Sequence, residues 1–134
     1  MADSVARLHT AVIAARGSDP TKSRTARLLR SGRAKIAKKL GEEAVEVVID
    51  AIHGQTEAVV RESADLLYNL VVLWVDAGIH PDDVWAEMRR RDRLFGIAEK
   101  LPKDLVPATE SRRKVVPKVV HLEPRHASKA NKRR

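Results

Sequence analysis

Cysteine is absent from this chain of 134 residues, and aromatic residues make up only 3% of it. Without cysteine there is no disulfide, no thiolate nucleophile and no cysteine-based zinc site, so a metal site must use oxygen or imidazole ligands. The sequence also lacks the run of roughly 20 apolar residues that a membrane-spanning helix needs. We therefore expect a soluble protein of the reducing cytoplasm, with no membrane contact.

Charge is unevenly distributed along the chain. The formal net charge is +8, but residues 109–134 alone hold nine Lys/Arg against two Glu. We expect residues 1–103 to form one domain and residues 104–134 to be a basic, Pro-containing, disordered tail. Because the tail lacks interleaved aromatic side chains, it favours weak nucleic-acid binding at most.

Apolar residues recur at intervals of three and four, which predicts an all-α protein. Glycine and proline stand at most of the expected helix boundaries. The pattern predicts a bundle of about four to five helices, which we place over residues 3–16, 23–31, 33–53, 56–76 and 81–91.

Two predicted helices carry acidic stripes. In KKLGEEAVEVVID, the side chains of Glu42, Glu43 and Glu46 lie on one helical face. In RESADLLYNL, Glu62 and Asp65 share a face of the next helix. Either stripe alone is more often a solvated face, but the two occur at matching distances from one predicted turn.

That turn, around Gly54, makes the two helices antiparallel neighbours. Glu43 precedes it by about ten residues and Glu62 and Asp65 follow it by about ten, so these carboxylates should converge. Converging carboxylates repel unless a cation neutralises them, and oxygen ligands favour Mg²⁺ or Mn²⁺. Since Mg²⁺ commonly takes substrate phosphates as further ligands, the stripes indicate a phosphorylated substrate.

A run of eight Lys/Arg without any acid extends from residue 22 to residue 39. Such cations can neutralise phosphate oxygens and the charge that develops in phosphoryl transfer. Lys35 and Lys39 are the first candidates because they share the acidic stripe, and Arg33 and Lys38 are further candidates. The alternative for each of them is a basic, solvated surface.

The acidic pattern E-E-x-x-E followed by E-x-x-D is similar to that of the all-α, MazG-like nucleotide pyrophosphohydrolases. The segments TARLLRSGRAKIAKKLGEEAVEVVIDA and ESADLLYNLVVLWVDAGIHPDDVWAEMRRR resemble the phosphoribosyl-ATP pyrophosphatases of histidine biosynthesis. The resemblance implies a MazG-like bundle completed by homodimerisation. It also implies Mg²⁺-dependent hydrolysis of phosphoribosyl-ATP to phosphoribosyl-AMP and pyrophosphate, with Mn²⁺ as the other candidate metal.

The resemblance assigns roles to individual residues as well. The metal ligands would be Glu43, Glu46, Glu62 and Asp65. Glu42 would be a further ligand or would orient the attacking water, which the metal would activate, and Lys35 and Lys39 would contact the phosphates. Asn69 stands where the family commonly has histidine, and it is a candidate for contact with substrate or metal.

Two other functions remain open from the sequence. A house-cleaning hydrolase of the same superfamily would remove non-standard nucleoside triphosphates with the same carboxylates, because a fold does not determine which base or sugar is recognised. A non-enzymatic helical module would instead bind nucleic acid through its basic tail, and that binding would weaken steeply with salt.

Overall fold

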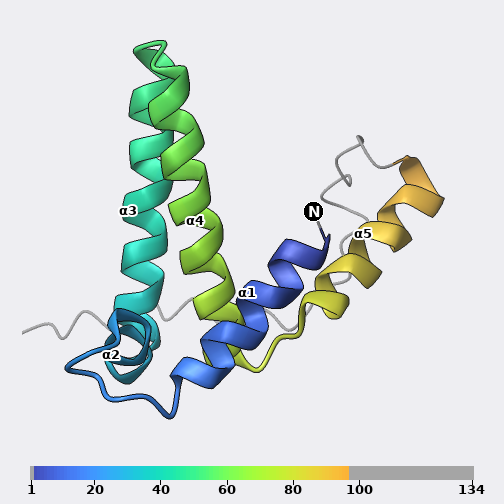
Figure 1. Cartoon of the computed structure of the whole chain (residues 1–134). Coiled ribbons are helices and arrows are strands. Elements are labelled where there is room, and N and C mark those ends of the chain that lie inside the picture. Colours follow the sequence, from blue (N-terminus) through green and yellow to red (C-terminus); the bar gives the residue numbers. More distant parts are fainter. Residues whose placement is uncertain (1, 97–134) are drawn as a thin grey trace, which may run out of the picture. The chain divides into compact units, whose positions relative to one another are not determined.

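The computed structural model describes residues 2–96, which form five α-helices (Figure 1). These residues contain no strand, so the predicted all-α fold is confirmed. The predicted tail, residues 104–134, lies outside the described part of the chain. The helices are α1 (Ala2–Ala15), α2 (Arg24–Arg30), α3 (Arg33–Ile52), α4 (Thr56–Ala77) and α5 (Pro81–Phe95).

Helices α3 and α4 form an antiparallel hairpin, and they share the most extensive helix-to-helix contact among the described residues (Figure 1). Gly54 makes the turn between them with a φ of 68°, a backbone conformation that glycine adopts without strain. The Gly54 N–H donates to the carbonyl of Ala51 (3.1 Å), and the Gln55 N–H donates to that of Asp50 (2.9 Å). These bonds satisfy the last carbonyls of α3 and place its acidic face beside that of α4.

The hydrophobic core lies around the second half of α4, where α1 and the start of α3 pack against it. Its buried members are Val5, Val12, Ile36, Val71, Val72, Trp74 and Val75. The Arg16 guanidinium joins α1 to this region by donating to the carbonyl of Val75 (2.9 Å). The core therefore anchors one end of the hairpin and leaves the end with Gly54 to solvent.

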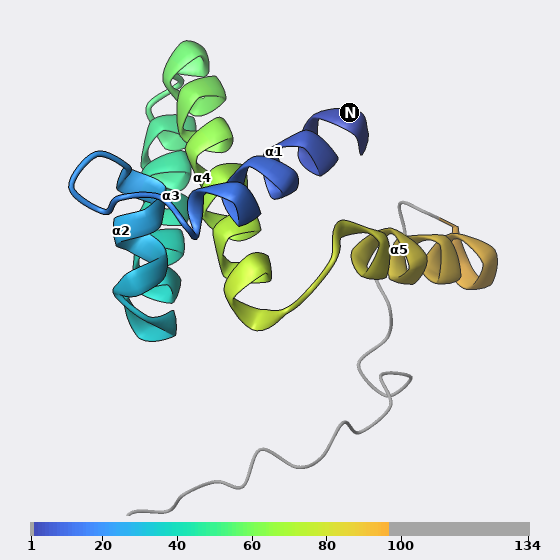
Figure 2. The ribbon, with the colours of Figure 1, turned by 60° about the horizontal axis from the view of Figure 1, so that its bottom comes forward.

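Helix α2 lies beside the first half of α3, as the view in Figure 2 shows. The Ser23 hydroxyl caps its first turn by accepting from the Ala26 N–H (3.1 Å), and Ala26 is 1% exposed. The hydroxyls of Thr25 and Tyr68 form a hydrogen bond of 2.6 Å between α2 and α4. Helix α2 is therefore held as a wall next to the hairpin.

Helix α5 continues to Phe95, four residues beyond its predicted end. The Glu87 carboxylate accepts from the guanidinium groups of Arg90 (2.7 Å) and Arg91 (2.8 Å), and these bonds lower the pKa of Glu87 to about 2. The expected end at residue 91 falls on these arginines, but their pairing with an acid one turn earlier favours continuation of the helix. Gly96, with a φ of 82°, ends it.

Candidate active site

The acidic stripes of α3 and α4 meet in the hairpin. Carboxylate oxygens of Glu43, Glu62 and Asp65 all lie within 4.8 Å of one another. Glu43 and Glu62 are half-buried, whereas Asp65 is exposed. Three of the four proposed metal ligands therefore lie close together, although α3 and α4 supply them from positions about twenty residues apart in the sequence.

Glu46, the fourth proposed ligand, lies outside that group of three but interacts with it. Its carboxyl lies close enough to those of Glu43 and Glu62 to influence the pKa of both. Partial burial, followed by this contact with Glu46 and the nearby negative charges, raises the pKa of both Glu43 and Glu62 above 4.5. The raised pKa values therefore reflect burial first and repulsion within the cluster second, and a bound cation would relieve the repulsion.

The donor set fits a hard divalent cation. It consists of carboxylate oxygens alone, without sulfur or imidazole, and three of them can contact one ion together. Oxygen ligands of this kind suit Mg²⁺ or Mn²⁺. The cluster is therefore a candidate metal site.

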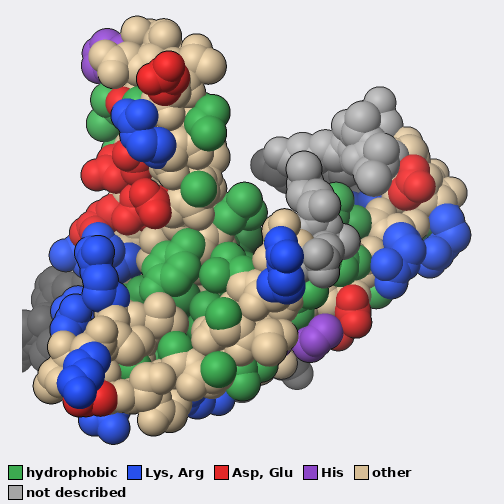
Figure 3. Space-filling model, in the orientation of Figure 1, with side chains coloured by type: hydrophobic (Ala, Val, Ile, Leu, Met, Phe, Trp, Pro, Cys, Tyr) green, Lys and Arg blue, Asp and Glu red, His purple; other side chains and the backbone are tan. Residues whose placement is uncertain are grey.

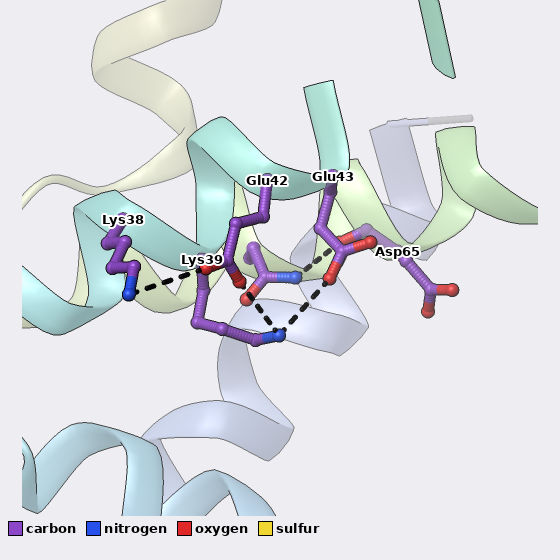
Figure 4. A network of polar contacts seen from close by, with 6 residues as sticks. Lys38, Lys39, Glu42, Glu43 and Asp65 are labelled. Carbon is purple, nitrogen blue, oxygen red and sulfur yellow. Dashed lines mark hydrogen bonds and ion pairs between the residues drawn. The ribbon is translucent and has the colours of Figure 1, made fainter. Parts of the chain in front are cut away.

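Lysine side chains border the carboxylate cluster on α3. Figure 4 shows the ammonium group of Lys39 between the carboxylates of Glu42 and Glu43, at 3.2 Å and 3.7 Å. The hydrogen bond to Glu42 and the nearby carboxylate charges raise the pKa of Lys39. Lys38 reaches the other oxygen of Glu42 at 3.7 Å. The cluster thus has a permanent positive neighbour in Lys39.

A pocket of about 690 Å³ opens between α2, α3 and α4, beside the carboxylates. This volume lies within the usual range for small-molecule sites. Five residues that the sequence singled out line it: Lys35, Lys39, Glu43, Asp65 and Asn69. Carboxylates and cations therefore share one concave surface.

Helix α2 supplies a wall of this pocket that the sequence did not reveal. Arg24 and Arg27 line the pocket. In the sequence they stood out only as two members of the run of eight Lys/Arg, without any sign of their place in a pocket. Thr25 lines the pocket together with Tyr68 of α4. Their hydrogen bond joins positions 43 residues apart, and no local pattern indicates it.

Two of the proposed phosphate-binding residues are turned elsewhere. The Arg33 guanidinium pairs with the carboxylate of Asp76 (2.8 Å) and donates to the Asp76 carbonyl (3.1 Å), at the end of α4. Lys38, which pairs with Glu42, is exposed and does not line the pocket. Of the four candidates, Lys35 and Lys39 are the ones that the pocket brings together.

Asn69 is buried in the pocket wall, with 4% of its surface exposed. Its amide nitrogen donates to the carbonyl of Asp65 (2.9 Å), and because a carbonyl only accepts, this bond determines which way the amide points. The side-chain oxygen of Asn69 has no hydrogen-bond partner among the described residues. A buried acceptor of this kind calls for a donor from a ligand or from water.

Comparison with known proteins identifies the family. The family model for phosphoribosyl-ATP pyrophosphohydrolase matches residues 5–92. The chain is 61% identical to a phosphoribosyl-ATP pyrophosphatase 2 of Rhodopseudomonas palustris over 130 residues, which cover 94% of this chain and 99% of the relative.

Two further relatives agree with this match. A phosphoribosyl-ATP pyrophosphatase 2 of Bradyrhizobium diazoefficiens is 59% identical over 87% of this chain and 92% of its own length. A phosphoribosyl-ATP pyrophosphatase of Gluconobacter oxydans is 54% identical over 70% of this chain and 71% of its own length. The chain therefore belongs to the phosphoribosyl-ATP pyrophosphohydrolase family, and it is an enzyme of the nucleotide pyrophosphohydrolase type.

Proposed function

We propose that this chain hydrolyses phosphoribosyl-ATP between its α and β phosphates, which yields phosphoribosyl-AMP and pyrophosphate, as a step of histidine biosynthesis. The observation that carries the proposal is the carboxylate cluster of Glu43, Glu62 and Asp65 beside a cation-lined pocket, in a chain of this family. The names of the relatives support the same substrate.

We further propose Mg²⁺ as the cofactor, with Mn²⁺ as a substitute. Glu43, Glu62 and Asp65 would hold the ion, with Glu46 as a fourth carboxylate in contact with two of them. When bound, the ion would neutralise phosphate charge and lower the pKa of a water molecule that attacks phosphorus. The raised pKa values of Glu43 and Glu62 support this assignment, because both carboxylates gain from a nearby cation.

The lysines of α3 act on the phosphates. Lys39 would exchange its contacts with Glu42 and Glu43 for a substrate phosphate, since all of these partners are anions competing for one ammonium group. The carboxylate of Glu42, released by Lys39, would then accept a hydrogen bond from the attacking water and orient it. Lys35 lies one turn before Lys39 on α3 and lines the same pocket.

A homodimer is the proposed assembly. On α3, Val45, Val48, Ile49 and Ile52 follow the spacing of a single helical stripe and are 46–77% exposed. Val60 and Leu67 on α4 add exposures of 65% and 49%. Exposed apolar side chains in this number favour a protein contact, and a second copy of the chain would bury them.

Light scattering coupled to size-exclusion chromatography tests the dimer. We expect a mass of two chains for the wild type and of one chain for Val48→Glu, because a charge would be buried in the contact. Ile13→Glu, an equally drastic change at a half-exposed residue of α1, should remain dimeric. A wild-type mass of one chain at all concentrations would overturn the proposal.

No helix among residues 2–96 is both long and apolar enough to cross a bilayer. The cytoplasmic location proposed here is the ordinary one for an enzyme that acts on a soluble nucleotide. A fusion to a fluorescent protein would test it directly.

The activity is tested by measuring pyrophosphate release from phosphoribosyl-ATP and from a panel of nucleoside triphosphates, with Mg²⁺ present or chelated. We expect metal-dependent turnover of phosphoribosyl-ATP and a loss of activity of about 10- to 100-fold in Glu46→Gln. Glu57→Gln, which removes an acid from the first turn of α4 outside the cluster, is the matched control. Turnover of other nucleotides alone would make the chain a house-cleaning hydrolase instead.

A further inference from the structure

We propose that the pocket contains a second phosphate subsite, in which Arg24 and Arg27 of α2 and Lys35 of α3 bind the monophosphate of the substrate's phosphoribosyl group. This inference rests on the proposed function, because it concerns the specificity of the same site. The carboxylates and Lys39 would hold the triphosphate end of the substrate. The three cations would hold the phosphate that an ordinary nucleoside triphosphate lacks.

The pocket has two chemically different ends. Lys35, Lys39 and Glu43 follow one another at intervals of four residues on α3, and all three line it. Each interval advances about 6 Å along a helix, so Lys35 lies roughly 12 Å from Glu43 along α3. In Figure 3, acidic side chains gather over the upper part of the hairpin, and basic side chains lie below them, towards α2.

Three cations that line the pocket, Arg24, Arg27 and Lys35, have no acidic partner within residues 2–96. None of the ion pairs in this part of the chain involves them, whereas Lys39 pairs with Glu42 and Glu43. Arg27 donates one N–H to the carbonyl of Pro20 (3.1 Å), which leaves other donors of its guanidinium group for a ligand. Cations grouped around one pocket repel each other, and a phosphate would offset that repulsion.

Helix α2 holds its two arginines in position. Ala26, between them, is 1% exposed and packs into the protein, and the neighbouring Thr25 is hydrogen-bonded to Tyr68 of α4. Only Ser31 and Gly32 separate α2 from α3, and side chains of both helices line the one pocket. A basic surface that served only solubility would need no such attachment.

The substrate has the matching chemistry. Phosphoribosyl-ATP carries a triphosphate on one ribose and a monophosphate on a second ribose, with adenine between them. Asn69 lines the same pocket one turn of α4 beyond Asp65, and its unpaired side-chain oxygen could accept a hydrogen bond from a sugar hydroxyl. Two phosphate sites and an unpaired acceptor in one pocket fit this molecule better than a nucleoside triphosphate with one charged end.

Steady-state kinetics of Arg24→Gln and Lys35→Gln test the subsite. We expect each change to raise KM for phosphoribosyl-ATP about tenfold or more and to leave kcat nearly unchanged, because the contact is remote from the cleaved bond. The control is Arg89→Gln, which removes an exposed arginine of α5. Unchanged KM, or a fall in kcat alone, would overturn the inference.

Binding measured without turnover separates this inference from the proposed function. Calorimetry should show that the wild type binds phosphoribosyl-AMP more tightly than AMP, and that Arg24→Gln and Lys35→Gln lose this preference. If the variants keep the preference, the subsite is wrong even where the enzyme hydrolyses phosphoribosyl-ATP. If the wild type binds phosphoribosyl-AMP in this way but does not hydrolyse phosphoribosyl-ATP, the proposed function fails and the subsite stands.

Discussion

At the scale of the residue, the amide of Asn69 is fixed on one side and unpaired on the other. Its nitrogen is bonded to the helix backbone, and its oxygen is buried without a partner among residues 2–96. An unpaired buried acceptor reduces stability, and a site retains one where a ligand supplies the missing donor. The amide oxygen is therefore better explained by binding than by folding.

Replacing Asn69 by leucine separates these two roles. We expect the free energy of unfolding to change by less than about 1 kcal/mol, because an acceptor without a partner is lost together with one hydrogen bond. KM for phosphoribosyl-ATP should rise about tenfold, since the substrate donor would face an apolar side chain. Asn69→His keeps a ring nitrogen as an acceptor, so its KM should rise less than that of the leucine variant. Equal kinetics for the wild type and both variants would contradict the assigned role.

The carboxylates predict an unusual pH dependence for the metal-free protein. The pKa values of Glu43 and Glu62 are raised in the folded state, so the folded state keeps protons that the unfolded chain has released. Their contribution to stability is fully present below the ordinary value of 4.5 and is lost as pH rises through the raised values. At neutral pH these groups therefore oppose folding unless a cation is bound.

Calorimetry of Glu62→Gln tests this sign. In the absence of divalent metal at pH 7 the variant should melt at a higher temperature than the wild type, because one repelling charge is gone. The difference should shrink towards pH 4, and Mg²⁺ should raise the melting temperature of the wild type more than that of the variant. A variant that is less stable than the metal-free wild type at pH 7 would contradict the repulsion.

At the scale of the element, α2 has only seven residues and would not be stable as an isolated helix. Its position depends on the Ser23 cap, on burial of Ala26, and on the hydrogen bond between Thr25 and Tyr68. The last of these contacts is also part of the pocket wall. Substrate binding should therefore be sensitive to this single bond between helices.

A double-mutant cycle measures that sensitivity. Tyr68→Phe and Thr25→Val should each lower the free energy of unfolding by about 1 kcal/mol and raise KM for phosphoribosyl-ATP. The double variant should lose little more free energy of unfolding than either single variant, because both substitutions remove the same bond. Fully additive effects would show that the two hydroxyls act independently.

At the scale of the whole molecule, stability and chemistry lie in different parts of the hairpin. The core gathers around the second half of α4, whereas the carboxylate cluster lies nearer to the turn at Gly54. Ile36 is fully buried and joins α3 to this core, although it follows directly after Lys35 of the pocket. A truncation in the core should therefore lower the free energy of unfolding more than it alters the geometry of the site.

Ile36→Ala tests this separation. Truncating a fully buried isoleucine should lower the free energy of unfolding by about 2–5 kcal/mol. Ile13→Ala, at a residue that is 49% exposed, should cost less than about 1 kcal/mol. Chemical denaturation of both variants and the wild type at one protein concentration measures these differences. A similarly small loss of unfolding free energy in both variants would show that Ile36 is not part of the core.

The sequence by itself determined the helices and the acidic half of the site. Helical periodicity and glycine positions are local signals, and the short turn at Gly54 leaves an antiparallel hairpin as the simple arrangement for Glu43, Glu62 and Asp65. The end of α5 was missed because side-chain pairing with Glu87 outweighed the preference for cations at a helix end.

Only the tertiary structure decided how the rest of the site is built. The position of α2 depends on contacts across 43 residues of sequence, so its place in the pocket wall had no local signature. The turning of Arg33 towards Asp76, and the bond that orients the amide of Asn69, depend on which partners folding brings within reach. Charge can be counted along a sequence, but the partner that each charge meets is decided by packing between helices.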